Sequence, residues 1–451
     1  MKSTDVLVIG GSAAGLVAAL TAKSFYREKT VTVVAKDEKT LVPCGIPYTF
    51  ASIDGTDSNI LPSDKMFKNA NIDLIIGEVT SIDPKNKTCV LKNKDGISYK
   101  KLVLATGSTP SIPRWLKGAD LENVFTVPKN KNYLDLMKTK LNQCKKIVVV
   151  GGGFIGVELS DELKKTGKEI TLIEKLPHIL GLCFDEEISI KADEVLRENG
   201  VILKTGIGVQ ELSGDKKVNK VLLENGEIID TDAVVLSIGY QSNTKLAKES
   251  GITISKEGCI KVDEYMRTDC PDVFAIGDCA QKYDFITRKP CCTMLASTAC
   301  AEARIAGYNL FKLSAIKTFS GTISIFSTMI GNTAFGVAGI TEAQAIKEGF
   351  DVVTGVFEGM DKHPGTLPGA KNQLVKLIVG KESSIILGGE VIGGHSVGEL
   401  TNIIGIIIQN RMSINSILTC QIGTHPLLTA SPAGYPLLKA VSDIAVKTNH
   451  L

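Results

Sequence analysis

Cys44 lies in an unusual setting for a thiol, within the stretch LVPCGIPYTF (41–50). It stands between Pro43 and Pro47, with Gly45 beside it, so the backbone around the sulfur is stiff. Two interpretations are open: an inert structural cysteine, or a thiol whose fixed position serves a reaction. The choice between these two interpretations depends on the elements predicted around this residue.

Two glycine-rich turns have the residue types that hold a dinucleotide. DVLVIGGSAAG (5–15) and KIVVVGGGFIG (146–156) each run from a short apolar strand into glycines and then into a helical segment. In such a turn the first glycine makes the bend, the second lets a pyrophosphate approach the backbone, and the third lets helix pack on strand. The phosphates then lie at a helix N-terminus. A single such turn also occurs for packing alone, but two in order predict two dinucleotide sites.

The second turn carries the complete pattern, with Gly151, Gly153 and Gly156. An acid, Glu174, follows 18 residues after the last of these, at the end of the predicted strand EITLIEK. An acid at that point binds an adenosine ribose with a free 2′-hydroxyl, which favours NADH. Lys175 stands next to it and leaves NADPH possible.

The first turn departs from the pattern twice. Gly10 and Gly15 are present, but Ser12 replaces the middle glycine, and the next predicted strand ends in Ala35 where an acid is expected. A ribose there must be held differently. Asp37 or Glu38 from slightly further on could substitute, or backbone and water could bind the hydroxyls.

Other predicted strands end in turns that carry polar residues. KLVLATGSTPSIP (101–113) and DAVVLSIGYQSNT (232–244) are apolar strands that end in turns, and PDVFAIGDCA (271–280) places Asp278 after a buried strand. We expect a hairpin around 224–226 and a helix from about 293 to 311. Towards the C-terminus, 322–341 and 373–381 have the β-branched runs of strands, and 390–410 passes from a strand into a helix.

Length and composition predict a soluble protein of several domains. The chain has 451 residues, 43% hydrophobic and 22% charged, and a net charge of +2, which gives no reason to expect nucleic acid or an anionic membrane. No signal peptide is recognisable, and the longest apolar run near the C-terminus, 403–408, is too short to span a bilayer. The eleven cysteines contain no CxxC and match no zinc spacing, so we expect no metal and a reducing, cytoplasmic compartment.

The order GGSAAG, PCGIPY, ATGSTP, GGGFIGVE and FAIGD resembles the FAD-dependent pyridine nucleotide-disulfide oxidoreductases over essentially the whole chain. The single cysteine is similar to the branch with coenzyme A disulfide reductase, NADH oxidase and peroxidase, and NAD(P)H sulfur reductases, because Thr49 stands where a dithiol relative has its second cysteine. The resemblance implies an α/β fold with two Rossmann-like domains. An FAD domain (1–112 and 240–318) would be interrupted by an NAD(H) domain (113–239), before a C-terminal α+β dimerisation domain (319–451).

The same resemblance implies roles for individual residues. Gly10, Gly15 and Thr106 would line the FAD site, Asp278 would bond its ribitol and phosphate side, and Glu158 would lie near the nicotinamide. Cys44 would be the redox-active atom beside the flavin. If PCGIPY begins a helix, the helix N-terminus would favour the thiolate.

His425, in CQIGTHPLLTASP (420–432), is similar to the histidine that reaches the partner's redox sulfur in dimeric disulfide reductases. It could be a structural hydrogen-bonder, or it could protonate a leaving thiolate. Tyr48 and Tyr435 could each be core or substrate contacts. The loop 361–372 lies where, by the resemblance, the coenzyme A branch contributes tyrosines to the thiol pocket. Here it offers His363 and no tyrosine, which weakens coenzyme A as the specific substrate.

Three functions follow from these residues. The first is an NADH-dependent flavoprotein that reduces a disulfide, persulfide or polysulfide, such as coenzyme A disulfide, through Cys44. The second is an NADH oxidase or peroxidase in which Cys44 cycles through a sulfenic acid. The third is a flavin-based redox carrier or sensor with a protein partner. The resemblance implies a homodimer, and His425 makes the dimer functionally necessary in the first of these functions.

Overall fold

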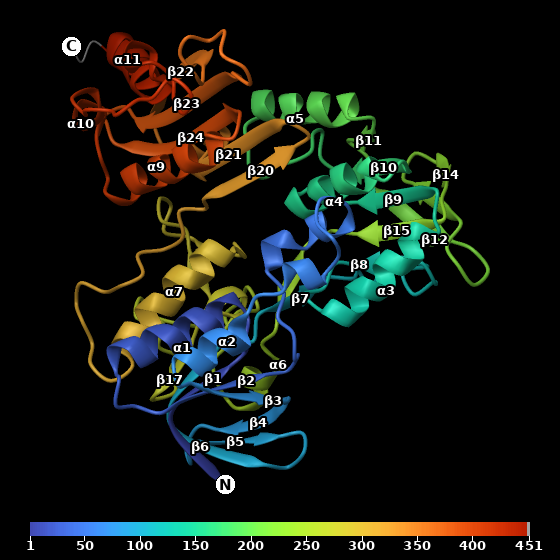
Figure 1. The fold of residues 1–451 in the computed structure, drawn as a ribbon, viewed down its shortest axis with the longest axis vertical. Coiled ribbons are helices and arrows are strands. Elements are labelled where there is room, and N and C mark those ends of the chain that lie inside the picture. Colours follow the sequence, from blue (N-terminus) through green and yellow to red (C-terminus); the bar gives the residue numbers. More distant parts are fainter. Residues whose placement is uncertain (449–451) are drawn as a thin grey trace.

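The first sheet is built from two parts of the chain that lie far apart in sequence (Figure 1). The computed structural model describes residues 1–448. The strand order is β3-β2-β1-β6-β5-β4, with β17 pairing in parallel with β6. The strands are β1 (Lys2–Ile9), β2 (Val31–Ala35), β3 (Asp73–Ile76), β4 (Val79–Asp83), β5 (Thr88–Leu91), β6 (Gly96–Leu104) and β17 (Val273–Ala275).

Helices cover this sheet, and α1 (Ala13–Phe25) packs along α7 (Ala296–Asn309) (Figure 1). Two shorter helices, α2 (Ser63–Asn69) and α6 (Lys245–Glu249), complete it. Since β17 and α7 follow the whole second sheet in sequence, the first unit is interrupted, as predicted. The chain leaves the first sheet after β6 and returns to it after β15. At these two places β7 (Ser108–Pro110) and β16 (Tyr240–Ser242) pair as a two-stranded antiparallel ribbon.

The second sheet is fully parallel, with the order β11-β10-β9-β15-β8. Its central strands are apolar and buried along Ile147–Val150 and Ala233–Leu236, because helices pack on one face of this sheet and a small antiparallel sheet packs on the other. The elements are β8 (Val124–Thr126), β9 (Lys146–Val150), β10 (Glu169–Glu174), β11 (Ile202–Thr205), β15 (Ala233–Leu236), α3 (Lys131–Asn142), α4 (Phe154–Lys165) and α5 (Glu186–Glu198).

A small antiparallel sheet follows β11, formed by β12 (Val209–Ser213), β13 (Lys220–Leu223) and β14 (Ile228–Asp230). The predicted hairpin is the turn between β13 and β14, where Gly226 has a φ of +85°. That left-handed conformation favours glycine, which explains why the chain turns there.

The third sheet is antiparallel, with the order β20-β21-β24-β23-β22. Helices α9 and α11 pack against it, and the apolar run at 403–408 belongs to α9. The elements are β20 (Phe326–Ile330), β21 (Thr333–Gly339), β22 (Val352–Met360), β23 (Asn372–Gly380), β24 (Ile386–Gly393), α8 (Glu342–Lys347), α9 (Val397–Gln409), α10 (Ile414–Leu418) and α11 (Pro436–Thr448).

Short elements connect the three sheets. They are the strands β18 (Lys282–Tyr283) and β19 (Pro290–Cys291) and the 3₁₀ turns η1 (Pro43–Gly45), η2 (Pro47–Phe50), η3 (Asp57–Asn59), η4 (Gly277–Cys279) and η5 (Pro432–Gly434). In residues 1–448, we find no helix with the length and apolar character needed to cross a membrane. The α/β class, the two Rossmann-like units and the C-terminal unit are as predicted.

Candidate active site

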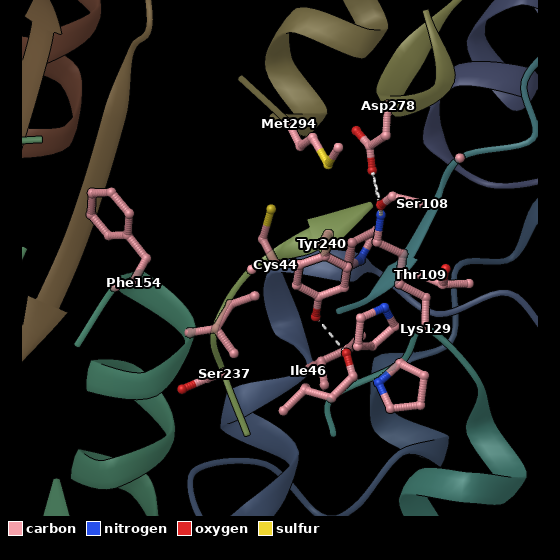
Figure 2. A pocket seen from close by; sticks show the side chains of 18 of the residues that line it. Cys44, Ile46, Ser108, Thr109, Lys129, Phe154, Ser237, Tyr240, Asp278 and Met294 are labelled. Atoms are coloured by element: carbon pink, nitrogen blue, oxygen red, sulfur yellow. Dashed lines mark hydrogen bonds and ion pairs between the residues drawn. The ribbon is translucent and has the colours of Figure 1, made fainter. Parts of the chain in front are cut away.

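One cavity of about 1430 Å³ lies where the three sheets meet. Both glycine turns, Cys44, Asp278 and the start of β20 contribute to its wall. A pocket for one drug-sized ligand measures roughly 300–1,000 Å³, so this cavity has room for more than one such group. Figure 2 shows the Cys44 sulfur directed into the open space, with Met294 and Phe154 from other elements around it.

The first glycine turn is tightly packed. Gly10 has a φ of +116°, and a Cβ on it would lie 2.1 Å from the carbonyl oxygen of Ala105. A Cβ on Gly15 would lie 1.8 Å from the carbonyl oxygen of Gly10. Gly15 therefore brings helix against strand and does not line the cavity, whereas Gly10 and Ser12 do.

The second turn repeats this construction. Gly151 has a φ of +104°, and a Cβ on Gly156 would lie 1.9 Å from the Gly151 carbonyl oxygen. Gly153 is the N-cap of α4, and a Cβ there would meet nothing within 4 Å. The backbone at Gly153 is thus open on the cavity side, which suits the approach of a phosphate to the helix N-terminus.

The strand after each turn ends differently, as the sequence predicts. Glu174 lines the cavity, and its carboxylate accepts hydrogen bonds from the backbone N–H groups of Gly152 and Leu176. At the corresponding place in the first turn, a Cβ on Gly11 would lie 2.8 Å from the Cβ of Ala35. Close packing of the turn therefore accounts for a small residue at position 35.

Of the two acids expected to replace one at position 35, Asp37 lines the cavity and Glu38 does not. The Asp37 carboxylate accepts a hydrogen bond of 2.9 Å from the Asn130 amide. Lys36 and Lys39 lie on the same wall. This end of the cavity thus offers one carboxylate and two ammonium groups.

Asp278, in η4, forms an ion pair of 2.6 Å with Lys129 and accepts a 2.7 Å hydrogen bond from the Ser108 hydroxyl (Figure 2). Burial by itself raises the pKa of Asp278, but the Lys129 charge and the hydrogen bonds outweigh it, so the pKa is below its ordinary value. Thr106 lies nearby, and its hydroxyl donates to the Asn243 carbonyl oxygen at 2.6 Å.

Cys44 is exposed to the cavity within η1. Burial of the sulfur among protein atoms raises the pKa of the thiol, and the Glu158 carboxyl raises it further, while Lys129 opposes both. The expected helix at PCGIPY is wrong, and so is the lowered pKa that depended on it. Pro47 has no N–H to give Pro43 an α-helical hydrogen bond, so the segment forms two 3₁₀ turns instead.

Glu158, on α4, faces the cavity from the opposite side. Burial raises its pKa to about 7, although a 2.8 Å hydrogen bond from the Thr328 hydroxyl lowers it in part. The rings of Phe154 and Phe326 stack beside it, with centroids 5.0 Å apart. A weakly acidic carboxyl and an aromatic wall thus stand across the cavity from the thiol.

His425 lies outside the cavity, on an exposed loop. Its Nδ1 accepts a hydrogen bond from Leu427, and His363 Nδ1 lies 3.0 Å from the carbonyl oxygen of Thr429 in the same loop. Tyr435 is half-buried against the core of the third sheet. Within residues 1–448 of one chain, the fold does not bring His425 to Cys44.

Three residues that the sequence did not indicate belong to this site: Lys129, Thr328 and Phe326. Lys129 precedes α3, whereas Thr328 and Phe326 lie on β20. No local pattern marks any of them. Only the position of β20 beside α4, far apart in sequence, would have revealed the last two.

Comparison with known proteins connects this arrangement to a family. A family model described as pyridine nucleotide-disulphide oxidoreductase matches residues 4–303. A second, described as the dimerisation domain of the same family, matches residues 325–433.

Individual relatives extend over almost the whole chain. An NADH oxidase of Methanocaldococcus jannaschii is 29% identical, with 98% of this chain and 99% of that one covered. A CoA-dependent NAD(P)H sulfur oxidoreductase of Pyrococcus abyssi is 30% identical, covering 92% and 93%. The solved structure of an NAD-dependent persulfide reductase from A. fulgidus superposes with a TM-score of 0.90 at 28% identity, covering 99% and 84%.

Proposed function

Because this chain belongs to the pyridine nucleotide-disulphide oxidoreductase family, we propose that it is an NADH-dependent flavoenzyme in which Cys44 reduces a disulfide, persulfide or polysulfide. The observation that carries the proposal is the single cavity that joins both glycine turns to the Cys44 sulfur. The family is FAD-dependent and uses NADH, and a bound FAD would supply two-electron transfer between NADH and a sulfur bond.

The residues of the first unit fit FAD. Gly10 and Gly15 leave no room for a side chain at the turn, so the backbone amides at the start of α1 stay available to a pyrophosphate. The Asp278 carboxylate, together with Thr106, offers hydrogen-bonding groups for sugar hydroxyls on the same wall. We assign the FAD domain to residues 1–112 and 240–318, the NAD(H) domain to 113–239 and the dimerisation domain to 319–451.

The second unit fits a pyridine nucleotide. Gly151 and Gly156 close the turn, Gly153 leaves the helix N-terminus open, and Glu174 stands where a ribose with a free 2′-hydroxyl would bind. Glu158 lies on the same helix, lines the same cavity and raises the pKa of the Cys44 thiol by its charge. We assign it to the nicotinamide side.

The overall reaction balances as NADH, one proton and a disulfide giving NAD⁺ and two thiols. Cys44 forms a mixed disulfide or persulfide with the acceptor, since it has no second cysteine within its own turn to complete an internal disulfide. The leaving thiolate needs a proton. We assign its delivery to His425 of a second copy, because the loop 420–432 is mostly exposed and outside the cavity of its own chain.

Homodimerisation is supported by the match of residues 325–433 to a dimerisation domain. All eleven cysteines are free in the structure, which supports a reducing, cytoplasmic compartment. No metal is needed for this reaction.

A sulfur acceptor is supported by relatives that act on sulfur compounds, including the NAD(P)H sulfur oxidoreductase and the persulfide reductase. An NADH oxidase is the second candidate, because another relative of similar identity carries that name. In that case Cys44 would pass through a sulfenic acid, and oxygen or peroxide would take up the electrons. A non-enzymatic carrier is not supported by these relatives.

The test is Cys44→Ser, studied under anaerobic conditions with NADH and a panel of disulfides and polysulfides. We expect bleaching of the flavin by NADH to persist while sulfur-compound turnover falls at least about 100-fold, since the thiolate nucleophile is lost. Cys292→Ser is the matched control, because Cys292 is exposed but does not line the cavity. Unchanged turnover in Cys44→Ser would refute the assignment, and faster consumption of oxygen or peroxide than of disulfide would favour the oxidase.

A further inference from the structure

The nucleotide side of the cavity contains a lysine that the choice of NADH does not explain. Lys175 follows Glu174 at the end of β10, and both line the cavity. An ammonium at that position can attract the 2′-phosphate of NADPH, just as Glu174 can bind the 2′-hydroxyl of NADH. The two neighbours therefore favour different coenzymes, and something else must decide between them.

Glu224 holds this lysine. It lies in the turn between β13 and β14, 49 residues after Lys175, and its Oε1 is 3.1 Å from the lysine Nζ. The other oxygen, Oε2, accepts a hydrogen bond from the Gly208 N–H at 3.3 Å. The Glu224 N–H in turn donates to the Gly208 carbonyl oxygen at 3.0 Å. Glu224, Lys175 and Gly208 all line the cavity.

Gly208 provides the space for this carboxylate. A Cβ on Gly208 would lie 2.6 Å from Oε1 and 2.9 Å from Oε2 of Glu224. Gly208 has no left-handed φ, so its backbone does not itself require glycine. Only the approach of Glu224 does. The turn and the loop before β12 are thus fitted to hold a carboxylate next to Lys175.

The sum of charges at this position is negative, because two carboxylates, Glu174 and Glu224, surround one ammonium, Lys175. A phosphate monoester brings about −1.5 to −2 at neutral pH. A 2′-phosphate would meet net repulsion there, whereas a free 2′-hydroxyl would not. We propose that Glu224 is a coenzyme-specificity residue that neutralises Lys175 and so makes the site select NADH against NADPH.

This assignment rests on the proposed function, because it takes the second glycine turn to be a pyridine-nucleotide site. The side chains of Lys175 and Glu224 are 74% and 48% exposed. Exposed ion pairs contribute little to stability. Substituting Glu224 will therefore change ligand choice without unfolding the protein.

The experiment is calorimetric titration of the purified protein with ADP-ribose and with its 2′-phosphorylated form, which carry no reactive nicotinamide. We expect Glu224→Gln to tighten binding of the phosphorylated ligand about 10-fold, equal to about 1.4 kcal/mol. Binding of ADP-ribose should change by less than about 2-fold. Glu227→Gln is the matched control, since Glu227 forms a 2.8 Å ion pair with Lys204 in the same unit but does not line the cavity.

A second variant tests the same assignment without removing the charge. Gly208→Ala should push the carboxylate away from Lys175 and shift the ratio of the two affinities in the same direction. A ratio that stays at the wild-type value in both variants would overturn the role of Glu224 alone. If the wild-type protein bound neither ligand, the pyridine-nucleotide site, and with it the proposed function, would be overturned.

Discussion

Lys376 offers the sharpest test of how the third sheet is attached to the rest of the molecule. It lies on β23 with its side chain 4% exposed, and it forms ion pairs with four carboxylates. Asp185 and Glu342 are each 2.8 Å away, Glu390 is 3.8 Å away, and Glu187 is in contact as well. Asp185 and Glu187 belong to the second unit, so this lysine joins two units.

The change Lys376→Met keeps the length of the side chain and removes the cation. Asp185 is 4% exposed, so this buried carboxylate would lose its counter-charge. Burial raises the pKa of Glu390, which is 0% exposed, well above its ordinary value, so Glu390 is not counted as a second charge. Removing one partner of a buried ion pair costs about 3–5 kcal/mol. The two units that Lys376 joins have about 130 residues each, a size at which a loss of 1 kcal/mol lowers the melting temperature by about 4 °C, which predicts a fall of about 12–20 °C.

The pH dependence of this deficit has a defined sign. Burial by itself raises the pKa of Asp185, but hydrogen bonds from Lys376 and the backbone outweigh it and leave the pKa below its ordinary 3.8. A lowered carboxylate pKa contributes stability above 3.8 that is lost as the pH falls through the folded value. The wild-type advantage over Lys376→Met should therefore be largest at neutral pH and shrink below pH 3.8.

Thermal unfolding measured by circular dichroism, at several pH values, is the assay. Lys381→Met is the matched control, because Lys381 pairs with Asp351 at 3.0 Å while both side chains are exposed. It should change the stability by no more than about 0.5 kcal/mol. Equal melting temperatures for the two variants would show that the buried cluster does not hold the third sheet, and the reasoning would be refuted.

Two further predictions concern Glu158, which lines the cavity, and Gly15, which packs behind the first glycine turn. Burial raises the pKa of Glu158 to about 7, so the folded state holds a proton that the unfolded state releases near 4.5, and the stability of the protein should fall as the pH rises between these values. The variant Glu158→Gln should lack this fall. A difference in melting temperature between wild type and variant that stays constant from pH 5 to about 7 would contradict the prediction. Gly15→Ala places a Cβ 1.8 Å from the Gly10 carbonyl oxygen, so helix and strand must separate at a cost of about 1–3 kcal/mol. We expect purified Gly15→Ala to contain less flavin, measured by visible absorbance, than purified Gly153→Ala, because a Cβ at Gly153 meets nothing within 4 Å. Equal flavin content in the two variants would count against the packing role of Gly15.

The parts of the fold that the sequence predicts well are those encoded by neighbouring residues. Each glycine turn is specified by about eleven consecutive residues, and in the structure a Cβ at Gly10 or Gly15 would collide with a backbone carbonyl oxygen. The hairpin at 224–226 is equally local, because one glycine with a positive φ defines it. Such patterns carry their own physical reason.

The parts that sequence could not predict depend on contacts between distant segments. Lys129 reaches Asp278 across 149 positions, and Thr328 reaches Glu158 across 170. Neither lysine nor threonine is unusual where it stands in the chain. The two 3₁₀ turns of PCGIPY differ from the expected helix for another reason. Each proline suits the first position of a helical turn, but Pro47 has no N–H to donate to Pro43, so the two prolines cannot belong to one α-helix.

The ionisation of Cys44 and Glu158 connects the cavity to the expected dimer. Each negative charge opposes the formation of the other, and with a Glu158 pKa of about 7 and a Cys44 pKa above 9.0, the carboxyl loses its proton first. Among the largest influences on the Cys44 pKa, Lys129 is the group that lowers it, and it is already paired with Asp278. One chain by itself therefore leaves the thiol protonated at neutral pH. We propose that His425 of a second copy supplies a proton-exchanging group at the sulfur, and on this proposal dimerisation would be part of the chemistry.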